Sequence, residues 1–459
     1  MSDARAAYTG NPEELQRWRA GSHAPPTVAV WEITLQCDLG CRHCGSRAGK
    51  ARTDELSTAQ AFDVIDQLAD FGVREVTLIG GEAYLRPDWD RLASRIVQRG
   101  MAYTMVTGGR AFTSERALAA AMAGISKIGV SLDGLAQTHD RQRGKPGSWE
   151  SAVASIDAIR GAGIEVALNT QINRLTMPEL PAVADFLIAR GVKSWMVQLT
   201  VPMGRAADRP GLLLQPYELL QLFPLLAWIK TEKLTPNGIG FFPGNNVGYF
   251  GPYETTLRYG GEMGFVWAGC GAGRASIGIE ADGKLKGCPS LPSAPYSGGN
   301  LKDRSLAEIF TTAPEITHIH ERSRDDLWGF CKTCMHADRC KAGCTWTSHS
   351  LMGRPGNNPY CHHRADTLHQ RGLRERVVSV RRAPGQPFDF GRFEIIEEDA
   401  SLPLPEDTLG TADRTALARL FDLRSDAQSI WDEQELSQAL KITTRHLEAT
   451  ASTEKGDKT

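Results

Sequence analysis

Residues 28–44 read VAVWEITLQCDLGCRHC, and the fold prediction starts from this stretch. The apolar run from Val28 to Leu35 has the β-branched and aromatic content of a buried strand. Three cysteines follow it with the spacing C-x₃-C-x₂-C, at Cys37, Cys41 and Cys44. Three thiolates at this spacing give an iron–sulfur cube three of the four it normally has, which leaves one iron without a protein ligand. The sequence therefore predicts a reactive metal centre directly after the first strand.

A zinc site is the alternative for three cysteines so close together. Structural zinc ligands usually come as C-x₂-C pairs that a second pair or histidines complete to four. The one added nitrogen within the stretch is His43, between two of the thiols. The spacing therefore favours iron and sulfide over a zinc knuckle.

Composition is that of a soluble globular protein of several domains, with 459 residues of which 41% are hydrophobic. The formal net charge of −2 provides no global attraction to nucleic acid or to an anionic membrane. The first residues are polar, and the most apolar stretch, from Leu212, is interrupted by Gln, Glu and Pro. Neither a signal peptide nor a membrane span is expected. We expect a cytoplasmic protein that binds neither nucleic acid nor membrane.

Cysteine usage also points to metal. The ten cysteines fall into three groups, with none between residues 45 and 269. Disulfide frameworks belong to small secreted domains and not to a large chain without an export signal. The clustering therefore indicates metal sites rather than disulfides.

Short β-rich runs alternate with helical segments from residue 28 to about 232. The strand candidates are 28–35, 75–80, 102–108, 127–134, 165–172 and 194–201. Because a helical segment follows each of them, they predict parallel βαβ units that close into a barrel-like sheet.

Functional loops in such barrels leave the carboxyl ends of the strands. The residues at those ends that carry or position chemistry are Cys37, Gly80, Gly81, Glu82, Thr107, Ser131, Asp133 and Asn169. We expect all of them to face one rim of the barrel.

The remaining chain divides into three parts. Residues 233–269 are rich in Gly, Pro and aromatics without a clear period, which predicts a bridging loop. Residues 270–365 hold the other seven cysteines, and residues 366–459 form an extension whose acidic and linker-like composition predicts partial disorder, with a short helix over Ser429 to Glu448. The basic run from Arg371 to Arg382 is interpreted as a solvated helix end, with a strand edge that binds an acidic peptide as the alternative.

The cysteine triplet and Gly80-Gly81-Glu82 together resemble the radical S-adenosylmethionine (radical SAM) enzymes, over about residues 28–232. The resemblance implies an α/β fold with a partial (β/α)₆ TIM-like barrel. It also implies that SAM chelates the open iron and is cleaved reductively to a 5′-deoxyadenosyl radical, which abstracts hydrogen from a substrate. The carboxylate of Glu82 would hold the SAM amine.

Further SAM contacts follow from the same resemblance. His43 corresponds to a position beside the adenine, Ser131 matches a SAM contact, and Arg143 is suited to the SAM carboxylate. Thr107, Asp133 and Asn169 are additional candidates, although Asp133 is equally suited to ordering its own SLDG turn.

The seven later cysteines resemble the SPASM pattern, a small domain with two auxiliary [4Fe-4S] clusters. The resemblance assigns Cys270, Cys288 and Cys344 to the first auxiliary cluster and Cys331, Cys334, Cys340 and Cys361 to the second. Together with the SAM cluster this implies three [4Fe-4S] clusters. Full cysteine ligation of both auxiliary clusters would need one more cysteine than the ten present, so we expect a free or non-cysteine position on the first. A pair of structural zinc ribbons is the disfavoured alternative.

SPASM proteins mostly modify ribosomally made peptides, while others mature sulfatases or act on small molecules. Pro289 stands where sulfatase-maturing relatives place a catalytic Asp, which argues against that activity. We expect a radical SAM oxidoreductase that oxidatively modifies, and preferentially cross-links, a ribosomal peptide. The alternatives are a small-molecule dehydrogenase or epimerase and a non-catalytic iron–sulfur electron carrier.

The expected partners are a peptide with a leader and an electron donor such as flavodoxin or ferredoxin. Only about 27 residues precede the first strand, too few for a leader-binding domain with its own core. The leader would then be held by a separate protein, by the C-terminal extension or by the barrel rim.

Overall fold

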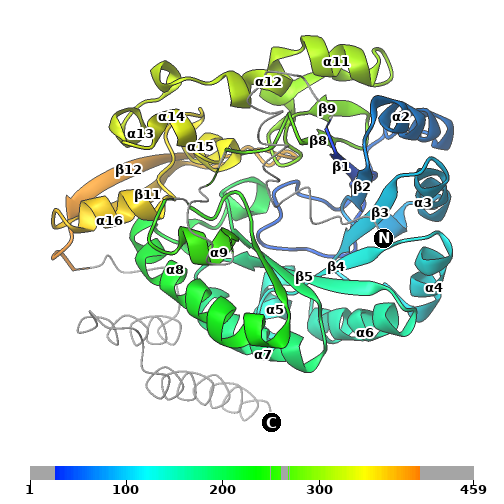
Figure 1. Ribbon diagram of the computed structural model, residues 1–459, viewed down its shortest axis with the longest axis horizontal. Helices are drawn as coiled ribbons and strands as arrows, with labels where there is room; N and C mark the ends of the chain where they lie inside the picture. The colour runs from blue at the N-terminus through cyan, green and yellow to red at the C-terminus, as the bar shows by residue number, and fades with distance from the viewer. Residues whose placement is uncertain (1–25, 249, 260–266, 268, 404–459) are drawn as a thin grey trace.

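A computed structural model describes residues 26–403 apart from 249, 260–266 and 268, and its centre is a curved ten-stranded sheet (Figure 1). The strand order is β10-β9-β8-β1-β2-β3-β4-β5-β6-β7. Strands β1 to β6 are Val28–Glu32, Glu75–Ile79, Ala102–Thr107, Lys127–Ser131, Glu165–Ile172 and Ser194–Leu199. Neighbours in this series pair in parallel, which confirms the six predicted strands and the barrel-like α/β fold.

Helices cover the convex face of this sheet (Figure 1). They are α2 (Thr58–Phe71), α3 (Trp89–Gln98), α4 (Ser114–Met122), α6 (Ser148–Gly161), α7 (Leu180–Ala189) and α8 (Leu219–Trp228). Helix α2 begins with a capping box between Ser57 and Gln60. Its fully buried residues are Ala61, Val64, Ile65 and Leu68, with flanking phenylalanines only partly buried against the core. This apolar face attaches the helix to the sheet.

Strand residues alternate between two environments. In β5 the residues Val166, Leu168, Thr170 and Ile172 are buried, while the residues between them are partly exposed or exposed. Since successive strand side chains point to opposite faces, the buried set packs under the helices and the other set lines the interior of the barrel. The interior therefore remains accessible at its rim, where the candidate site residues lie.

The bridging region differs from the loop that was expected. Gly240–Pro243 form β7, which extends the sheet by pairing in parallel with β6, and Glu254–Tyr259 form the helix α9. The sequence pattern did not predict these two elements, because a four-residue strand and a six-residue helix are too short to show a clear apolar periodicity.

The cysteine-rich region continues the same sheet at its other edge. Strand β8 (Ser276–Ile279) pairs in parallel with β1, and β9 (Lys284–Lys286) and β10 (Ser297–Asn300) follow in antiparallel order. Around them lie α10 (Ser293–Tyr296), α11 (Leu306–Thr312), α12 (Pro314–Glu321), α13 (Phe330–Thr333), α14 (Ala337–Cys340), α15 (Thr345–Met352) and α16 (His362–His369). The small domain is thus joined to the barrel by backbone hydrogen bonds.

The first part of the C-terminal extension is a β-hairpin of β11 (Leu373–Arg381) and β12 (Arg392–Asp399). The basic run was expected to be a helix end, and this is wrong because Arg374 and Arg376 are paired with Glu398 across the two strands. The outer edge of β11 already has hydrogen-bond partners at Val377. Val377 N donates to Gln215 Oε1 at 2.7 Å, and Gln215 Nε2 donates to Val377 O at 3.2 Å. The helix expected over residues 429–448 lies outside the described residues.

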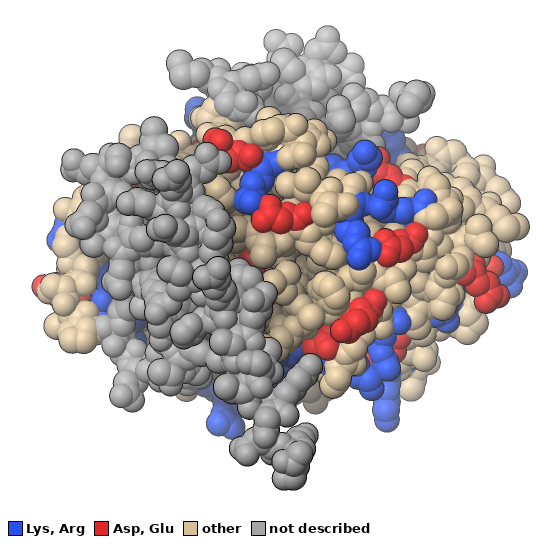
Figure 2. All heavy atoms as spheres, turned by 90° about the horizontal axis from the view of Figure 1, so that it is seen from below, with Lys and Arg blue, Asp and Glu red and all other residues tan. Residues whose placement is uncertain are grey.

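One described segment, Pro210–Asn237, has the length and mean hydropathy of a membrane span. Of its most apolar window, 67% is buried inside the protein. That burial identifies it as a core segment around α8 and not as a surface-exposed apolar helix. Charged side chains of both signs alternate over the described part of one face, consistent with the small net charge (Figure 2).

Candidate functional site

The loop that carries Cys37, Cys41 and Cys44 leaves the carboxyl end of β1 and folds back on itself. Cys37 N donates to Gly49 O at 3.0 Å, which closes the loop at its base. Arg205 donates to Cys41 O at 2.7 Å and to Ala48 O at 3.1 Å, so a side chain from beyond β6 fixes the loop from outside.

Burial makes these thiols poor acids in the absence of a cation. It raises the pKa of Cys41 to about 11, and it raises that of Cys37 further still. A buried thiol binds as thiolate when a metal centre compensates the desolvation of its charge. The donor set fits an iron–sulfur cluster.

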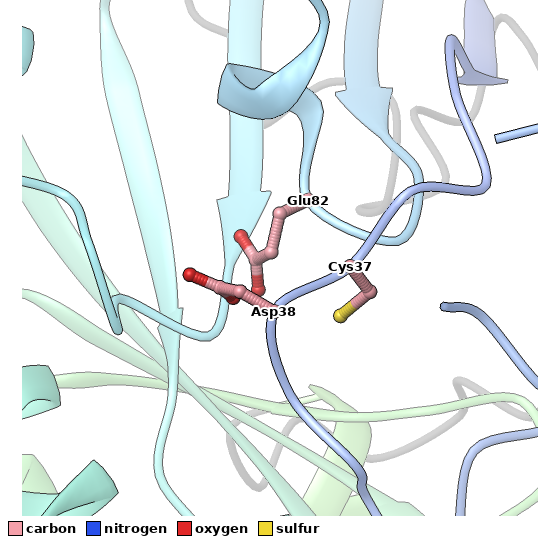
Figure 3. A group of neighbouring side chains, drawn as sticks. All are labelled: Cys37, Asp38 and Glu82. Carbon is pink, nitrogen blue, oxygen red and sulfur yellow. The ribbon is translucent and has the colours of Figure 1, made fainter. Parts of the chain in front are cut away.

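Glu82 lies beside this loop at the end of β2. Ligand atoms of Cys37, Asp38 and Glu82 lie within 4.8 Å of one another, and the Glu82 carboxylate points toward Asp38 (Figure 3). Thr107 Oγ1 and Gly108 N each donate to Glu82 at 2.6 Å. Burial nevertheless raises the pKa of Glu82 to about 7. A carboxylate held this way is suited to an added cation such as an ammonium group.

Gly80 and Gly81 provide close backbone packing at this point. A Cβ on Gly80 would lie 2.4 Å from Thr34 O, and one on Gly81 would lie 2.1 Å from Gln36 O. Gly81 N donates to Thr34 O at 2.9 Å. The described contacts of both glycines are thus to the segment that leads from β1 into the cysteine loop, so they bring Glu82 next to the cysteines.

His43, Asp133 and Arg143 form a buried charged group behind the loop. His43 Nε2 and Arg143 Nη2 lie 3.2 and 2.8 Å from Asp133 Oδ2, and Arg143 Nη1 donates to Cys41 Sγ at 3.7 Å. Burial lowers the pKa of His43 to about 4, so this imidazole is neutral near pH 7. Although burial opposes ionisation, Arg143 and His43 hold the pKa of Asp133 below its ordinary value.

This arrangement gives Arg143 a second carboxylate partner in addition to the SAM group that the sequence suggested. Arg143 Nε, His43 Nδ1 and Asp38 Oδ1 are buried and have no hydrogen-bond partner among the described residues. Unpaired buried polar atoms are rare in native proteins, and several around one loop fit a site where a bound polar ligand supplies the missing partners.

The remaining rim candidates lie on adjacent strands. Ser131 and Asn169 are register partners on β4 and β5, and both are partly exposed toward the barrel interior. Gly129 makes room for the Asn169 amide, which lies 2.7 Å from where a Cβ would be. Thr107 faces Glu82 and is buried. The structure therefore brings every SAM candidate to the same rim.

The three cysteines assigned to the first auxiliary cluster converge. Cys270 and Cys288 pack on one small apolar group that includes Tyr296, with Trp346 beside them. Burial, together with the neighbouring thiols of Cys288 and Cys344, raises the pKa of Cys270 to about 12.

The four cysteines assigned to the second auxiliary cluster line a single cavity, together with aromatic and histidine side chains. The cysteines are Cys331, Cys334, Cys340 and Cys361. Asn358 N donates to Cys331 Sγ and His336 N donates to Cys334 Sγ, each at 3.4 Å. Such amide donors to sulfur are typical around iron–sulfur clusters, where they tune the potential.

Sequence reasoning gave no role to the stretch VPMGRA at residues 201–206, which connects two of these sites. Gly204 has φ +58°, and a Cβ there would lie 2.3 Å from Cys44 O. Met203 Sδ accepts from Trp346 Nε1 at 3.1 Å and from Ser350 Oγ at 3.7 Å, both on α15. The helix α15 starts directly after Cys344, so Met203 links the SAM-cluster loop to the first auxiliary group. The sequence signal that could have identified this stretch is the glycine followed by an arginine, Gly204-Arg205, shortly after the strand β6.

Comparison with known families gives two matches. Residues 31–187 match the radical SAM superfamily, and residues 270–335 match an iron–sulfur cluster-binding domain named SPASM.

Relatives of known name cover most of the chain. The Fe-coproporphyrin III synthase of Methanosarcina barkeri is 30% identical over 338 residues, which are 70% of this chain and 80% of that protein. The mycofactocin maturase MftC of Mycobacterium tuberculosis is 29% identical over 357 residues, 76% of this chain and 86% of the relative.

Among solved structures, Streptococcus suis SuiB bound to S-adenosylmethionine has the same fold, with a TM-score of 0.59, 17% identity and coverage of 77% of this chain and 82% of that one. The fold, the arrangement of the cysteines and the named relatives all indicate the same family. The chain belongs to the radical SAM superfamily and carries a SPASM iron–sulfur domain after its barrel.

Proposed function

We propose that this radical SAM enzyme oxidatively modifies a ribosomally synthesised peptide, preferentially by cross-linking. The observation that carries the proposal is the connection of the SAM-cluster loop to the first auxiliary cysteines through Met203 and Trp346. A substrate in the barrel mouth would lie between a source of radicals and a neighbouring electron acceptor. Removal of a hydrogen atom and then an electron is a net oxidation.

The relatives support a peptide substrate. The mycofactocin maturase covers 76% of this chain, and SuiB has been solved with its precursor peptide SuiA. Similarity to SuiB at 17% identity concerns the fold alone. The peptide assignment therefore depends mainly on the maturase relatives and on the SPASM domain.

Particular residues would hold the cofactors. Cys37, Cys41 and Cys44 would hold the SAM cluster, Glu82 the SAM ammonium group, and Arg143 its carboxylate. Ser131 and Asn169 on the rim, with Thr107 behind Glu82, would orient the ligand, and His43 would lie beside the adenine. When bound, SAM and its cluster supply a 5′-deoxyadenosyl radical that abstracts hydrogen.

The two auxiliary groups would complete the route for the electron. Cys270, Cys288 and Cys344 would hold the cluster nearer the SAM-cluster loop, and the cluster held by the four cysteines of the second cavity would pass the electron outward. A flavodoxin or ferredoxin is the partner we propose for supplying electrons to the SAM cluster.

The test uses peptides encoded beside this gene. The reconstituted enzyme is incubated with SAM, dithionite and each candidate peptide, and the products are measured by mass spectrometry. We expect one peptide to lose hydrogen in step with 5′-deoxyadenosine formation. No 5′-deoxyadenosine under any condition would instead revive the non-catalytic electron carrier.

An iron tetrapyrrole is the second candidate substrate, because the relative at 30% identity is named Fe-coproporphyrin III synthase. Titration of the enzyme with Fe-coproporphyrin III separates the two. A shifted Soret band, SAM-dependent conversion and no change in any peptide would favour the tetrapyrrole. Turnover of another small metabolite would favour the dehydrogenase or epimerase alternative.

A further inference from the structure

The loop between β11 and β12 reaches from the C-terminal hairpin to the SAM-cluster loop. Arg47, shortly after Cys44, donates from Nε to Asp389 Oδ1 at 2.7 Å. Gly204 N donates to Asp389 O at 2.7 Å, and Met203 forms an isolated antiparallel bridge with Phe390. The hairpin tip therefore contacts both the cysteine loop and the segment that supports it.

Asp389 is a buried carboxylate whose acceptor positions are used. Its Oδ2 accepts from Gly385 N at 2.5 Å and Gln386 N at 3.0 Å, while Oδ1 accepts from Arg47. The Arg47 guanidinium also makes a bidentate contact with Asp208, at 2.6 and 2.8 Å. Charged bidentate pairs of this kind fix geometry as well as adding energy.

Arg47 and the residue before Asp389, Phe388, both have backbone in the left-handed region without being glycine. Arg47 has φ +51° and Phe388 has φ +57°. Such conformations persist only where surrounding contacts enforce them, and they concentrate at functional sites. The Arg47–Asp389 pair joins Arg47 to the residue that directly follows Phe388, so it supplies part of that enforcement at both positions.

The aromatic side chains on either side of Asp389 face the first auxiliary group. The Phe388 ring lies 4.4 Å from Lys286 Nζ, two residues before Cys288. The Phe390 ring packs edge-on against His349 at 4.6 Å, and His349 Nδ1 is 2.8 Å from the Tyr296 hydroxyl. Tyr296 in turn packs in the apolar group that holds Cys270 and Cys288.

We propose that Phe388, Asp389 and Phe390 form a wall between the SAM cluster and the first auxiliary cluster, and that Asp389 is a positioning residue for the SAM-cluster loop. Through Arg47 it would fix the backbone after Cys44, and the two rings would exclude water from the space between the two clusters. This inference goes beyond the oxidation proposed above and does not depend on the substrate.

The experiment compares D389N with E398Q on the reconstituted full-length protein, using SAM and dithionite without substrate. Both variants remove one negative charge from the same hairpin, but Glu398 pairs with Arg374 and Arg376 and not with the cluster loop. We expect D389N to weaken SAM binding about tenfold, as followed by the change in the electron paramagnetic resonance (EPR) signal on SAM addition, with E398Q unchanged. We expect F390A to keep SAM affinity and to raise substrate-free 5′-deoxyadenosine formation several-fold.

Wild-type SAM affinity in D389N, or an equal loss in E398Q, would overturn the positioning role. Wild-type substrate-free cleavage in F390A would overturn the wall. If D389N does not fold with its clusters, R47K tests the same contact and leaves the hairpin sequence intact. Weakened SAM binding in R47K supports the positioning role of the Arg47–Asp389 pair, and wild-type binding overturns it. Because no substrate is added, failure of the peptide proposal leaves each of these results interpretable.

Discussion

At the residue scale, Glu82 links acid–base chemistry to SAM binding. Burial raises its pKa to about 7, so its ionised fraction increases as the pH rises through that value. If the carboxylate holds the SAM ammonium group, SAM affinity should rise by about tenfold between about pH 6 and 8. Isothermal titration across this range measures it.

The matched variants are E82Q and E32Q. Glu32 is also buried with a pKa raised to about 7, but its partner is Arg52, away from Glu82. E82Q should bind SAM weakly and without pH dependence, whereas E32Q should keep the wild-type profile. An unchanged profile in E82Q would exclude Glu82 as the titrating group.

Gly204 gives a second prediction at this scale. A Cβ there would lie 2.3 Å from both Cys44 O and Gly45 O, so G204A must displace the cysteine loop. We expect loss of the SAM cluster with the auxiliary clusters retained, measured as a decrease of about four iron atoms per chain.

Gly238 provides the control for G204A. It also has positive φ, at +66°, but an added Cβ meets no heavy atom within 4 Å. G238A thus introduces backbone strain without a clash and should keep its full iron content. Equal iron loss in both variants would attribute the effect to strain alone.

The residue identities at this scale were mostly available from the sequence. Spacing alone indicated Cys37, Cys41 and Cys44, and resemblance supplied Glu82 and Arg143. The pairing of Arg143 with Asp133 and the support of the loop by Arg205 were not available. Arg205 reaches the loop from beyond β6, and Arg143 meets Asp133 only because the helix α5 (Ala136–Arg143) turns the chain back, so no pattern within a few residues encodes either contact.

At the element scale, side chains from both the barrel and the cysteine-rich region hold the base of the C-terminal hairpin. The Gln215 amide bonds to both backbone groups of Val377, and Arg364 pairs with Glu375 at 2.6 Å. Q215A should lower the free energy of unfolding by about 1–2 kcal/mol, because two hydrogen bonds are lost. Thermal unfolding under anaerobic conditions measures this, and limited proteolysis locates the loosened region.

Q67A is the comparison for Q215A, since the Gln67 amide also makes two hydrogen bonds, to Asp63 on its own helix α2 and from Leu306 N. It should leave proteolysis of the hairpin unchanged. Resistance of the Q215A hairpin at wild-type level would show that other contacts suffice to hold β11.

The elements divide into those with and without a local signature. Six strands and the capped helix α2 were predicted because alternation, apolar runs and caps are properties of short stretches. Strand β7 and the hairpin were missed, since short or two-stranded edge elements depend on partners far along the chain.

At the scale of the whole molecule, the three cysteine groups should behave as separate clusters. Replacing Cys37, Cys41 and Cys44 by alanine should leave about eight iron atoms per chain instead of about twelve, with the auxiliary EPR signals intact. Iron analysis of the reconstituted protein tests this. Loss of all iron would mean that the auxiliary clusters need the first one to assemble.

The same variant tests the missing ligand of the first auxiliary cluster. With the SAM cluster absent, an auxiliary iron without a cysteine ligand is the remaining expected site for added cyanide. We expect cyanide to shift one auxiliary EPR signal. Spectra that show four thiolates on both auxiliary clusters would contradict the expectation drawn from the ten cysteines.

The sequence by itself determined the strand series, the metal chemistry and the membership in the radical SAM superfamily. These depend on spacing within a few residues, on periodicity and on ligand type, all of which a linear chain carries. The tertiary structure alone decided that the SPASM strands join the barrel sheet at β1, and that the hairpin tip lies beside Arg47 across 342 residues of chain. Contacts between such distant segments arise from packing and charge pairing, for which the chain has no local pattern.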